Sequence, residues 1–215
     1  IITRSFKVAP LLRNHWHGHS EIATTTQRDQ VALSIKGQLI NMFVTHGHCA
    51  TPFKGTVDKL KVSLDQSSYF GSGSNAMEMA FEINPKSFVG PETQVTDRVT
   101  TSSMFMDEDN PKMVFKSTNT FKMGEDWYQI NGKLSIKGID KDVKFFATKV
   151  VNSEDPKSGL LVLEGQFNIL DWGIDYDKII YGESSSVPTQ WMHINMKIDL
   201  AEAAKPSFSV IDYFN

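Results

Sequence analysis

Apolar and polar residues alternate with a period of two along most of this chain. In residues 127–136 every second position is Tyr, Ile, Gly, Leu or Ile, and polar residues fill most of the positions between them. The same alternation returns in residues 76–83, 161–169 and 192–198. Strict alternation indicates β-strands with one buried and one exposed face, so the chain is predicted to consist mainly of such strands.

Short polar turns separate these stretches, and helical patterns are sparse. Residues 71–75, 124–126 and 138–141 carry the Gly, Asn, Asp and Ser that favour turns. Short turns between strands imply antiparallel neighbours. Short helices are expected only around residues 97–107 and 200–204. The prediction is an all-β domain of about eight or more strands.

One-sided strands with little helix must bury their apolar faces in a sandwich or in a closed barrel. The inward positions include Gly55, Gly132 and Gly165, which predicts space beneath these strands. Most of the nine methionines also fall at apolar positions. Flexible methionines suit an apolar ligand, but they also suit an ordinary packed core. A sandwich and a barrel, with or without a cavity, therefore all remain open.

Composition excludes several classes of protein. The 215 residues carry 22 basic and 25 acidic side chains, a formal charge of −3, so nucleic acid is not an expected partner. The longest apolar run has four residues, at 160–163, which is far short of the roughly 20 that span a bilayer. The single cysteine, Cys49, excludes an intramolecular disulfide.

Five segments, in order along the chain, resemble motifs of the YceI-like, polyisoprenoid-binding family. Residues 110–117 (NPKMVFKS) resemble its YP-x-hydrophobic-x-F-x-S strand, and residues 130–139 (INGKLSIKGI) resemble its V-x-G-x-L-T-I-x-G-V strand and turn. Residues 53–56, 103–107 and 164–174 are similar to three further family segments. Two departures are Asn110, where the family usually has Tyr, and Leu170, where it commonly has Arg.

The resemblance implies a lipocalin-like, extended antiparallel β-barrel of about eight strands with one or two short helices. The barrel would span residues 28–200, between a His-rich N-terminal extension (1–27) and a C-terminal tail (201–215). Family members hold a long apolar lipid, such as an isoprenoid, quinone or fatty-acid chain, and no catalysis is expected. The resemblance also implies a bacterial periplasmic or secreted protein whose signal peptide has been removed, acting in transport or sensing. A homodimer is left open.

The inward apolar side chains are the expected lining of the lipid tube, because each buried CH₂ contributes about 0.8 kcal/mol without needing a directional contact. Three of them, at 104–106, are expected in a cap over the tube. The expected ligand-binding residues are Met77, Met79, Phe81, Met104, Phe105, Met106, Phe115, Leu134, Ile136, Phe145, Leu163, Phe167, Ile194 and Met196.

Histidine clustering suggests a second function, metal binding. His15, His17 and His19 alternate in the N-terminal extension, and His46 and His48 flank a glycine. Imidazoles bind Zn²⁺ and Cu²⁺, and the two groups could share an ion if the extension folds back over the barrel. Neither spacing matches a known zinc motif, so a polar arm and a polar loop are the alternative. A third function is an interaction module with a filled core.

Catalytic chemistry has little support in the sequence. Cys49 follows His48 directly, and neighbours on a strand point to opposite faces, so an unreactive thiol is expected. The carboxylates of residues 107–109 are expected to form a solvated rim. Asp171, Asp175 and Asp177 lack the spacing of a calcium loop and are expected in a polar loop.

Overall fold

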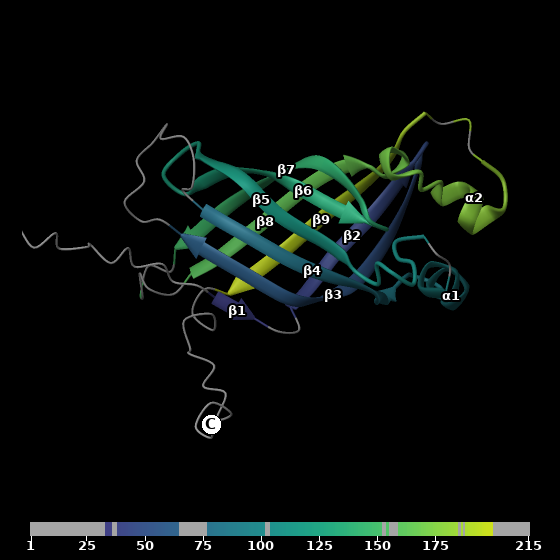
Figure 1. Cartoon of the computed structure of the whole chain (residues 1–215), viewed down its shortest axis with the longest axis horizontal. Helices are drawn as coiled ribbons and strands as arrows, with labels where there is room; N and C mark the ends of the chain where they lie inside the picture. The colour runs from purple at the N-terminus through teal and green to yellow at the C-terminus, as the bar shows by residue number, and fades with distance from the viewer. Residues whose placement is uncertain are drawn as a thin grey trace, which may run out of the picture.

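The alternating segments form the strands of one antiparallel barrel in the computed structural model of the chain (Figure 1). The structure describes residues 33–35, 38–64, 77–101, 104–151, 154, 159–184, 186 and 188–199. In chain order the elements are β1 (Leu33–Ile35), β2 (Gln38–His46), β3 (Cys49–Leu64), β4 (Met77–Val89), α1 (Thr93–Thr101), β5 (Met113–Lys122), β6 (Trp127–Ile136), β7 (Ile139–Val151), β8 (Gly159–Asn168), the 3-10 helix η1 (Ile169–Trp172), α2 (Tyr176–Tyr181) and β9 (Gln190–Asp199).

Eight of these strands close into a ring. Each strand from β4 to β9 pairs antiparallel with the next, β9 pairs with β2, β2 with β3, and β3 with β4. The predicted closed antiparallel barrel of about eight strands with few short helices is confirmed, and a sandwich is excluded. Closure matters because it leaves each strand with a neighbour on both sides and directs one face of every strand to the interior.

The long strand β3 pairs with two different strands along one of its edges. Its first half pairs with β2, from His46↔Cys49 to Gln38↔Val57, and its second half pairs with β1, from Ile35↔Leu60 to Leu33↔Val62. The register is the same in both halves, so β1 continues the line of β2 along β3. On its other side β3 pairs with β4, with register shifts near Lys54 and Val57.

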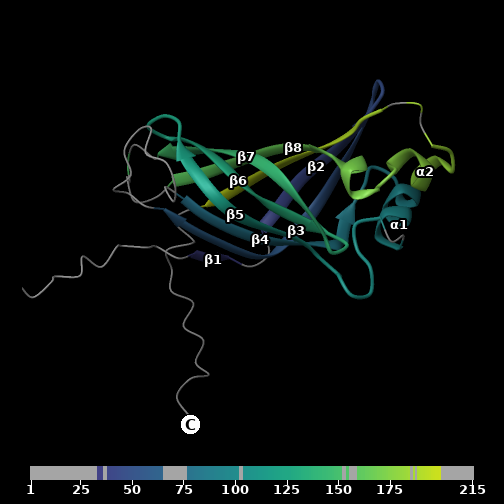
Figure 2. The ribbon, with the colours of Figure 1, turned by 45° about the horizontal axis from the view of Figure 1, so that its top comes forward.

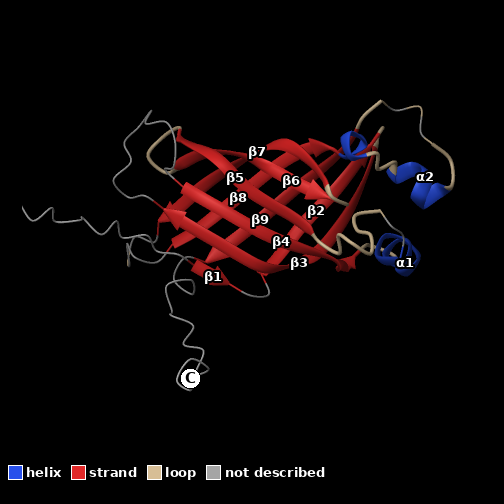
Figure 3. Ribbon diagram, viewed as in Figure 1, coloured by secondary structure: helices blue, strands red, loops and turns tan. Residues whose placement is uncertain are grey.

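The two α-helices lie together at one end of the barrel (Figures 1 and 3). Their positions differ from expectation. Helix α1 spans Thr93–Thr101 rather than 97–107, and residues 104–107 form a loop. Neither α2 nor η1 was predicted, because six and four residues are too short to show a helical stripe. The expected helix at 200–204 lies outside the described residues.

Side chains from the helical end belong to the same core as those of the strands. Val99 of α1, Phe105 of the following loop, Trp172 of η1 and Ile180 of α2 are buried with the inward strand residues. Figure 2 shows both helices beside this end of the barrel after rotation. The barrel thus has a helical end and an opposite end, where β4 and β8 begin and β5 and β7 end.

Candidate functional site

The interior of the barrel is apolar over most of its length. Of the fourteen side chains expected to line it, all are buried except Met106, which is half-buried in the loop before β5. Met104 and Phe105 lie in that loop, and the Phe105 ring packs edge-on against Phe88 of β4, with centroids 5.5 Å apart. The structure therefore places these residues in the interior or beside it, and their contact with a ligand stays a prediction.

Three phenylalanines meet in the middle of the barrel. Phe81 of β4 and Phe115 of β5 stack with ring centroids 4.9 Å apart. Phe145 of β7 packs edge-on against both, at 5.7 Å and 4.8 Å. All three are at most 1% exposed. Aromatic contacts of this kind stabilise beyond the area they bury, so this phenylalanine cluster is a solid part of the core.

The glycines do not leave the empty space that the sequence predicted. A Cβ at Gly132 would lie 2.5 Å from the Phe115 ring, and a Cβ at Gly165 would lie 2.3 Å from the Phe145 ring. At Gly55 the corresponding neighbour is Phe88, at 2.8 Å. A phenylalanine ring therefore packs directly over each of these glycines. The expectation of unfilled space beneath these strands is wrong at all three positions.

The wall between β4 and β5 is incomplete away from the helices. The two strands share a ladder from Ile83↔Met113 to Ala80↔Lys116, and the register of β5 with β6 shifts just beyond, between Ser117 and Asn119. Past the ladder, side-chain hydroxyls join the strands.

Two such hydroxyls join β4 and β5 beyond the ladder, and we call this part of the strand pair the seam. The backbone N–H of Met79 donates to Ser117 Oγ at 2.9 Å, and Thr120 Oγ1 donates to the Met77 carbonyl. Thr120 is fully buried, so its hydroxyl needs this partner. Because side-chain bonds replace ladder bonds here, the seam between β4 and β5 is held more weakly than the rest of this pair.

A groove of about 220 Å³ opens on the outer wall at this seam. Its lining includes the exposed Lys61 and Lys116 and also Met77 and Met79, whose side chains are buried in the core. Ala80 lies between the two lysines. The groove therefore lies on the outer wall, beside the start of β4 and so at the end of the barrel away from the helices.

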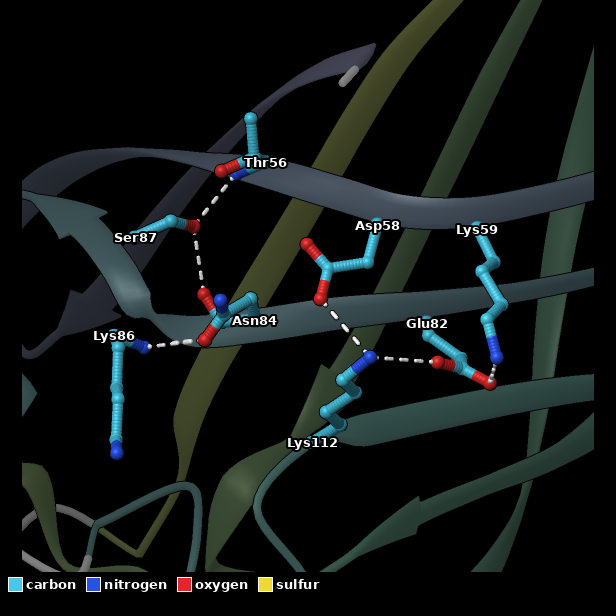
Figure 4. Close-up of polar contacts among 8 residues, drawn as sticks. All are labelled: Thr56, Asp58, Lys59, Glu82, Asn84, Lys86, Ser87 and Lys112. Atoms are coloured by element: carbon cyan, nitrogen blue, oxygen red, sulfur yellow. Dashed lines mark hydrogen bonds and ion pairs between the residues drawn. The ribbon is translucent and has the colours of Figure 1, made fainter. Parts of the chain in front are cut away.

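Ion pairs hold the other end of the β4–β5 pair together. Lys112, just before β5, lies 3.0 Å from Asp58 of β3 and 2.9 Å from Glu82 of β4, and Lys59 reaches Glu82 at 3.5 Å (Figure 4). The hydrogen bond from Lys112 lowers the pKa of Glu82, and in return raises the pKa of Lys112. These ion pairs thus join β3, β4 and β5 at one end of the β4–β5 pair, whereas side-chain hydrogen bonds join β4 and β5 at the other end.

The same close-up shows how β4 accommodates an irregular stretch. Ser87 Oγ accepts from the Thr56 N–H at 2.8 Å and donates to the Asn84 carbonyl at 2.6 Å, while Asn84 Oδ1 accepts from the Lys86 N–H (Figure 4). These bonds satisfy backbone groups where the ladder between β3 and β4 shifts register.

The helical end holds a buried polar cluster. His46, at the end of β2, has Nδ1 2.9 Å from Oδ1 of Asp177 in α2. Gln190 Nε2 donates to Asp175 Oδ1 at 3.0 Å and to Asp177 Oδ2 at 3.4 Å, and Gln190 Oε1 accepts from the Tyr176 N–H at 2.6 Å. Burial raises the pKa of Tyr176 to about 12. This cluster fixes α2 against the start of β9.

The metal hypothesis gains no support from the described residues. Among them, no three His, Cys, Asp or Glu side chains are grouped to hold an ion. His46 is buried in β2 rather than in a polar loop, and His48 is exposed in the two-residue turn to β3. His15, His17 and His19 lie outside the described residues. Zinc or copper binding through that segment stays a prediction.

The acidic residues correct the sequence interpretation in part. Asp177 is buried in α2, so the expected polar loop is wrong for this residue. Asp175 lies in the loop just before α2, as expected, and caps that helix by accepting from the Lys178 N–H at 3.1 Å. Asp171 is exposed. Asp107 accepts from the Asn110 N–H and side chain, which lowers the pKa of Asp107 and shapes the turn before β5.

Several residues of these sites were missed by sequence reasoning. For Asp175 only the role was missed: an Asp two residues after Gly173 and two residues before Asp177 is a recognisable helix start and could have located α2. No local signal identifies Gln190, Lys61 or Lys116, because their roles depend on neighbours from other strands. Ser117 ends the motif of residues 110–117, but that motif does not reveal its bond to β4.

In the part of the chain that is described, no helix is long and apolar enough to span a membrane. A family model for the YceI-like domain matches residues 18–201. The fold is similar to that of BcnA from Burkholderia cenocepacia, with 16% identity, a TM-score of 0.55, and coverage of 74% of this chain and 94% of that one. It is also similar to a polyisoprenoid-binding domain from Saccharophagus degradans, with 8% identity, a TM-score of 0.52, and coverage of 78% and 97%. No curated protein matches the sequence.

Proposed function

Since the chain belongs to the YceI-like family, we propose that it binds a long apolar lipid, such as an isoprenoid chain, inside its barrel. The polyisoprenoid-binding domain with the same fold supports this ligand class. Binding, rather than catalysis, is the activity that the family supports. The lipid would be carried or sensed by the protein.

The observation that carries the proposal is the apolar interior. Alternate residues of all eight ring strands contribute apolar side chains to one continuous core. Near the seam this core contains Met77 and Met79, and Met196 faces it from β9. An apolar chain in such a place gains about 0.8 kcal/mol per buried CH₂, which adds up over a long isoprenoid.

The packed interior sets a condition on binding. A lipid chain needs more room than the 220 Å³ groove provides, so side chains near the seam must change rotamer. Methionine has three rotatable bonds and adapts at low cost. A lipid chain would therefore displace protein side chains at the methionine-lined end. The phenylalanine cluster would mark the limit of the space that the lipid chain occupies.

Native mass spectrometry of the protein purified from an expressing bacterium tests the proposal. A bound lipid appears as an adduct of several hundred daltons that organic extraction removes. The stripped protein should then take up geranylgeraniol at low micromolar concentration. Absence of an adduct together with no uptake of geranylgeraniol would contradict lipid binding.

A barrel filled by its own side chains is the second candidate, and the seating of Phe115 and Phe145 on glycines favours it. In that case the protein would act as an interaction module through its surface. The same experiment separates the two, because a filled barrel neither carries nor acquires lipid.

A further inference from the structure

Four apolar side chains gather on the outer wall of the barrel at the end away from the helices. Trp127 at the start of β6 stacks on Phe146 of β7, with ring centroids 5.7 Å apart and an interplanar angle of 25°. Val150 lies further along the same outward face of β7, and the Met123 N–H donates to the Trp127 carbonyl at 2.8 Å across the β5–β6 turn. These four side chains are 37–51% exposed, and we call them the aromatic patch.

This clustering is not repeated elsewhere on the described part of the chain. Nine large hydrophobic side chains are exposed there, and four of them form the aromatic patch. The other five are spread over β2, the helical end of β4 and β7, and α2: they are Leu39, Phe43, Val89, Ile139 and Tyr181. Contiguous exposed apolar side chains mark a surface that contacts a partner or a membrane.

The apolar surface continues onto β8 but stays small. Val150 pairs with Leu160, and Thr148 pairs with Trp127 on one side and with Val162 on the other. Even with these two half-buried residues of β8, six apolar side chains are far fewer than the roughly 20–30 residues per side of a stable protein–protein interface. The outside of a closed barrel is also convex, so a rigid partner would reach few additional residues. A second copy of the chain therefore fits this surface poorly.

The border of the aromatic patch carries no net charge. Among the chain neighbours and cross-strand partners of its four residues, Asp126 and Glu164 are acidic, and Lys122 and Lys149 are basic. The border therefore gives no net attraction for a charged partner, and contact must depend on the apolar side chains. Tryptophan and its aromatic neighbour suit the membrane–water interface, because the rings are buried there while the indole N–H stays near polar head groups.

We propose that the aromatic patch docks the protein on a lipid surface, with the Trp127 and Phe146 rings inserted among the head groups. The patch lies at the same end of the barrel as Met77 and Met79, near which a bound lipid chain would displace protein side chains. Burial of each CH₂ also holds an isoprenoid in a membrane, so docking would place the barrel beside the source of its ligand. The inference goes beyond lipid binding in the interior, because docking does not require an occupied barrel.

Flotation with phosphatidylcholine vesicles tests docking alone, because these vesicles carry no net charge and no isoprenoid. The full chain is compared with the Trp127→Thr/Phe146→Thr double variant. The matched control is Phe43→Thr/Ile139→Thr, which removes two apolar side chains of similar exposure, 40% and 43%, elsewhere on the wall. Threonine is well tolerated in strands, and circular dichroism checks that all variants are folded.

We expect the wild type to bind the vesicles and the double variant to bind them on the order of tenfold more weakly, since burying a large apolar side chain is worth about that factor. The control should bind as the wild type does, and added salt should not weaken binding. Brominated phosphatidylcholine should quench the tryptophan fluorescence of the wild type more than that of Trp127→Phe. Trp172 and Trp191 lie at the helical end and should contribute little to the quenching.

Three results would overturn docking through the aromatic patch: no vesicle binding by the wild type, an equal loss in the control, or quenching that Trp127→Phe leaves unchanged. A wild-type dimer that the double variant loses, measured by light scattering, would assign the patch to a second copy and also overturn the proposal. Uptake of geranylgeraniol is measured separately, so a failure of docking leaves lipid binding in the interior intact.

Discussion

The ring of Phe145 rests on Gly165, its direct cross-strand partner: a Cβ at Gly165 would lie 2.3 Å from two ring carbons. The glycine is needed because a neighbouring strand places a rigid aromatic ring over its α-carbon. The ring in turn contacts Phe81 and Phe115, so this one position supports the phenylalanine cluster in the middle of the barrel.

Replacing Gly165 with alanine should therefore lower the free energy of unfolding by about 1–3 kcal/mol, the usual cost of overpacking. Urea denaturation measures the change. Gly124→Ala is the matched control, because the nearest atom to its Cβ would be 3.6 Å away, an ordinary contact.

A second substitution makes the cause specific. Phe145→Leu removes the ring, so Gly165→Ala should cost clearly less in that background than in the wild type, as a double-mutant cycle would measure. Equal costs in both backgrounds would mean that the Phe145 ring is not what excludes a side chain at Gly165.

Lipid binding inside the barrel should make the affinity for the lipid depend on the polarity of the side chain at the position of Met79. Met79→Gln keeps the length of the side chain but places an amide beside the apolar chain, and affinity for geranylgeraniol should fall about tenfold. Met123→Gln makes the same change at a side chain that is 40% exposed and should leave affinity unaltered. Titration of both variants gives the comparison; equal affinities would place the lipid away from Met79.

The seam between β4 and β5 should open more readily without the Ser117 hydroxyl. Ser117→Ala removes the acceptor of the Met79 N–H, a loss of about 1 kcal/mol, so this amide should exchange with solvent about fivefold faster. Hydrogen exchange followed by NMR measures the rate. Thr148→Ala, at an exposed position of β7, is the control. An unchanged rate at Met79 would show that the hydroxyl does not hold the seam closed.

Acid should weaken the ion pairs that join β3, β4 and β5. Because Lys112 lowers the pKa of Glu82 below its ordinary 4.5, the Glu82 carboxylate stabilises the folded chain above that value. This contribution is lost as the pH falls through the lower, folded-state pKa. Glu82→Gln should thus be less stable than the wild type at pH 7, by about 1 kcal/mol, and nearly equal to it below that pKa.

Thermal unfolding of both proteins between pH 7 and pH 2 measures this difference. Asp142→Gln, which changes a carboxylate that is 86% exposed, should show little pH-dependent difference from the wild type. A stability gap for Glu82→Gln that stays constant with pH would argue against the ion pair as its source.

Local patterns were sufficient for the strands but not for the helices. The period of two identified the stretches around Tyr128, Met79, Leu163 and Ile194 as one-sided strands, and each has its apolar face buried. Helix α2 was missed because six residues show no stripe, and its place depends on Gln190, which bonds to the Tyr176 N–H from another element.

The one-dimensional order of apolar and polar residues was enough to say which side chains turn inward, because side-chain direction alternates along any strand. It left a sandwich and a closed barrel open, and the resemblance to the YceI-like family favoured the barrel. Only the folded chain decided which side chains are neighbours in space. Ring closure and register put Phe145 on Gly165, His46 beside Asp177, and Lys61 and Lys116 on either side of Ala80. Those neighbours come from strands and helices far apart in sequence, and no local pattern encodes their pairing.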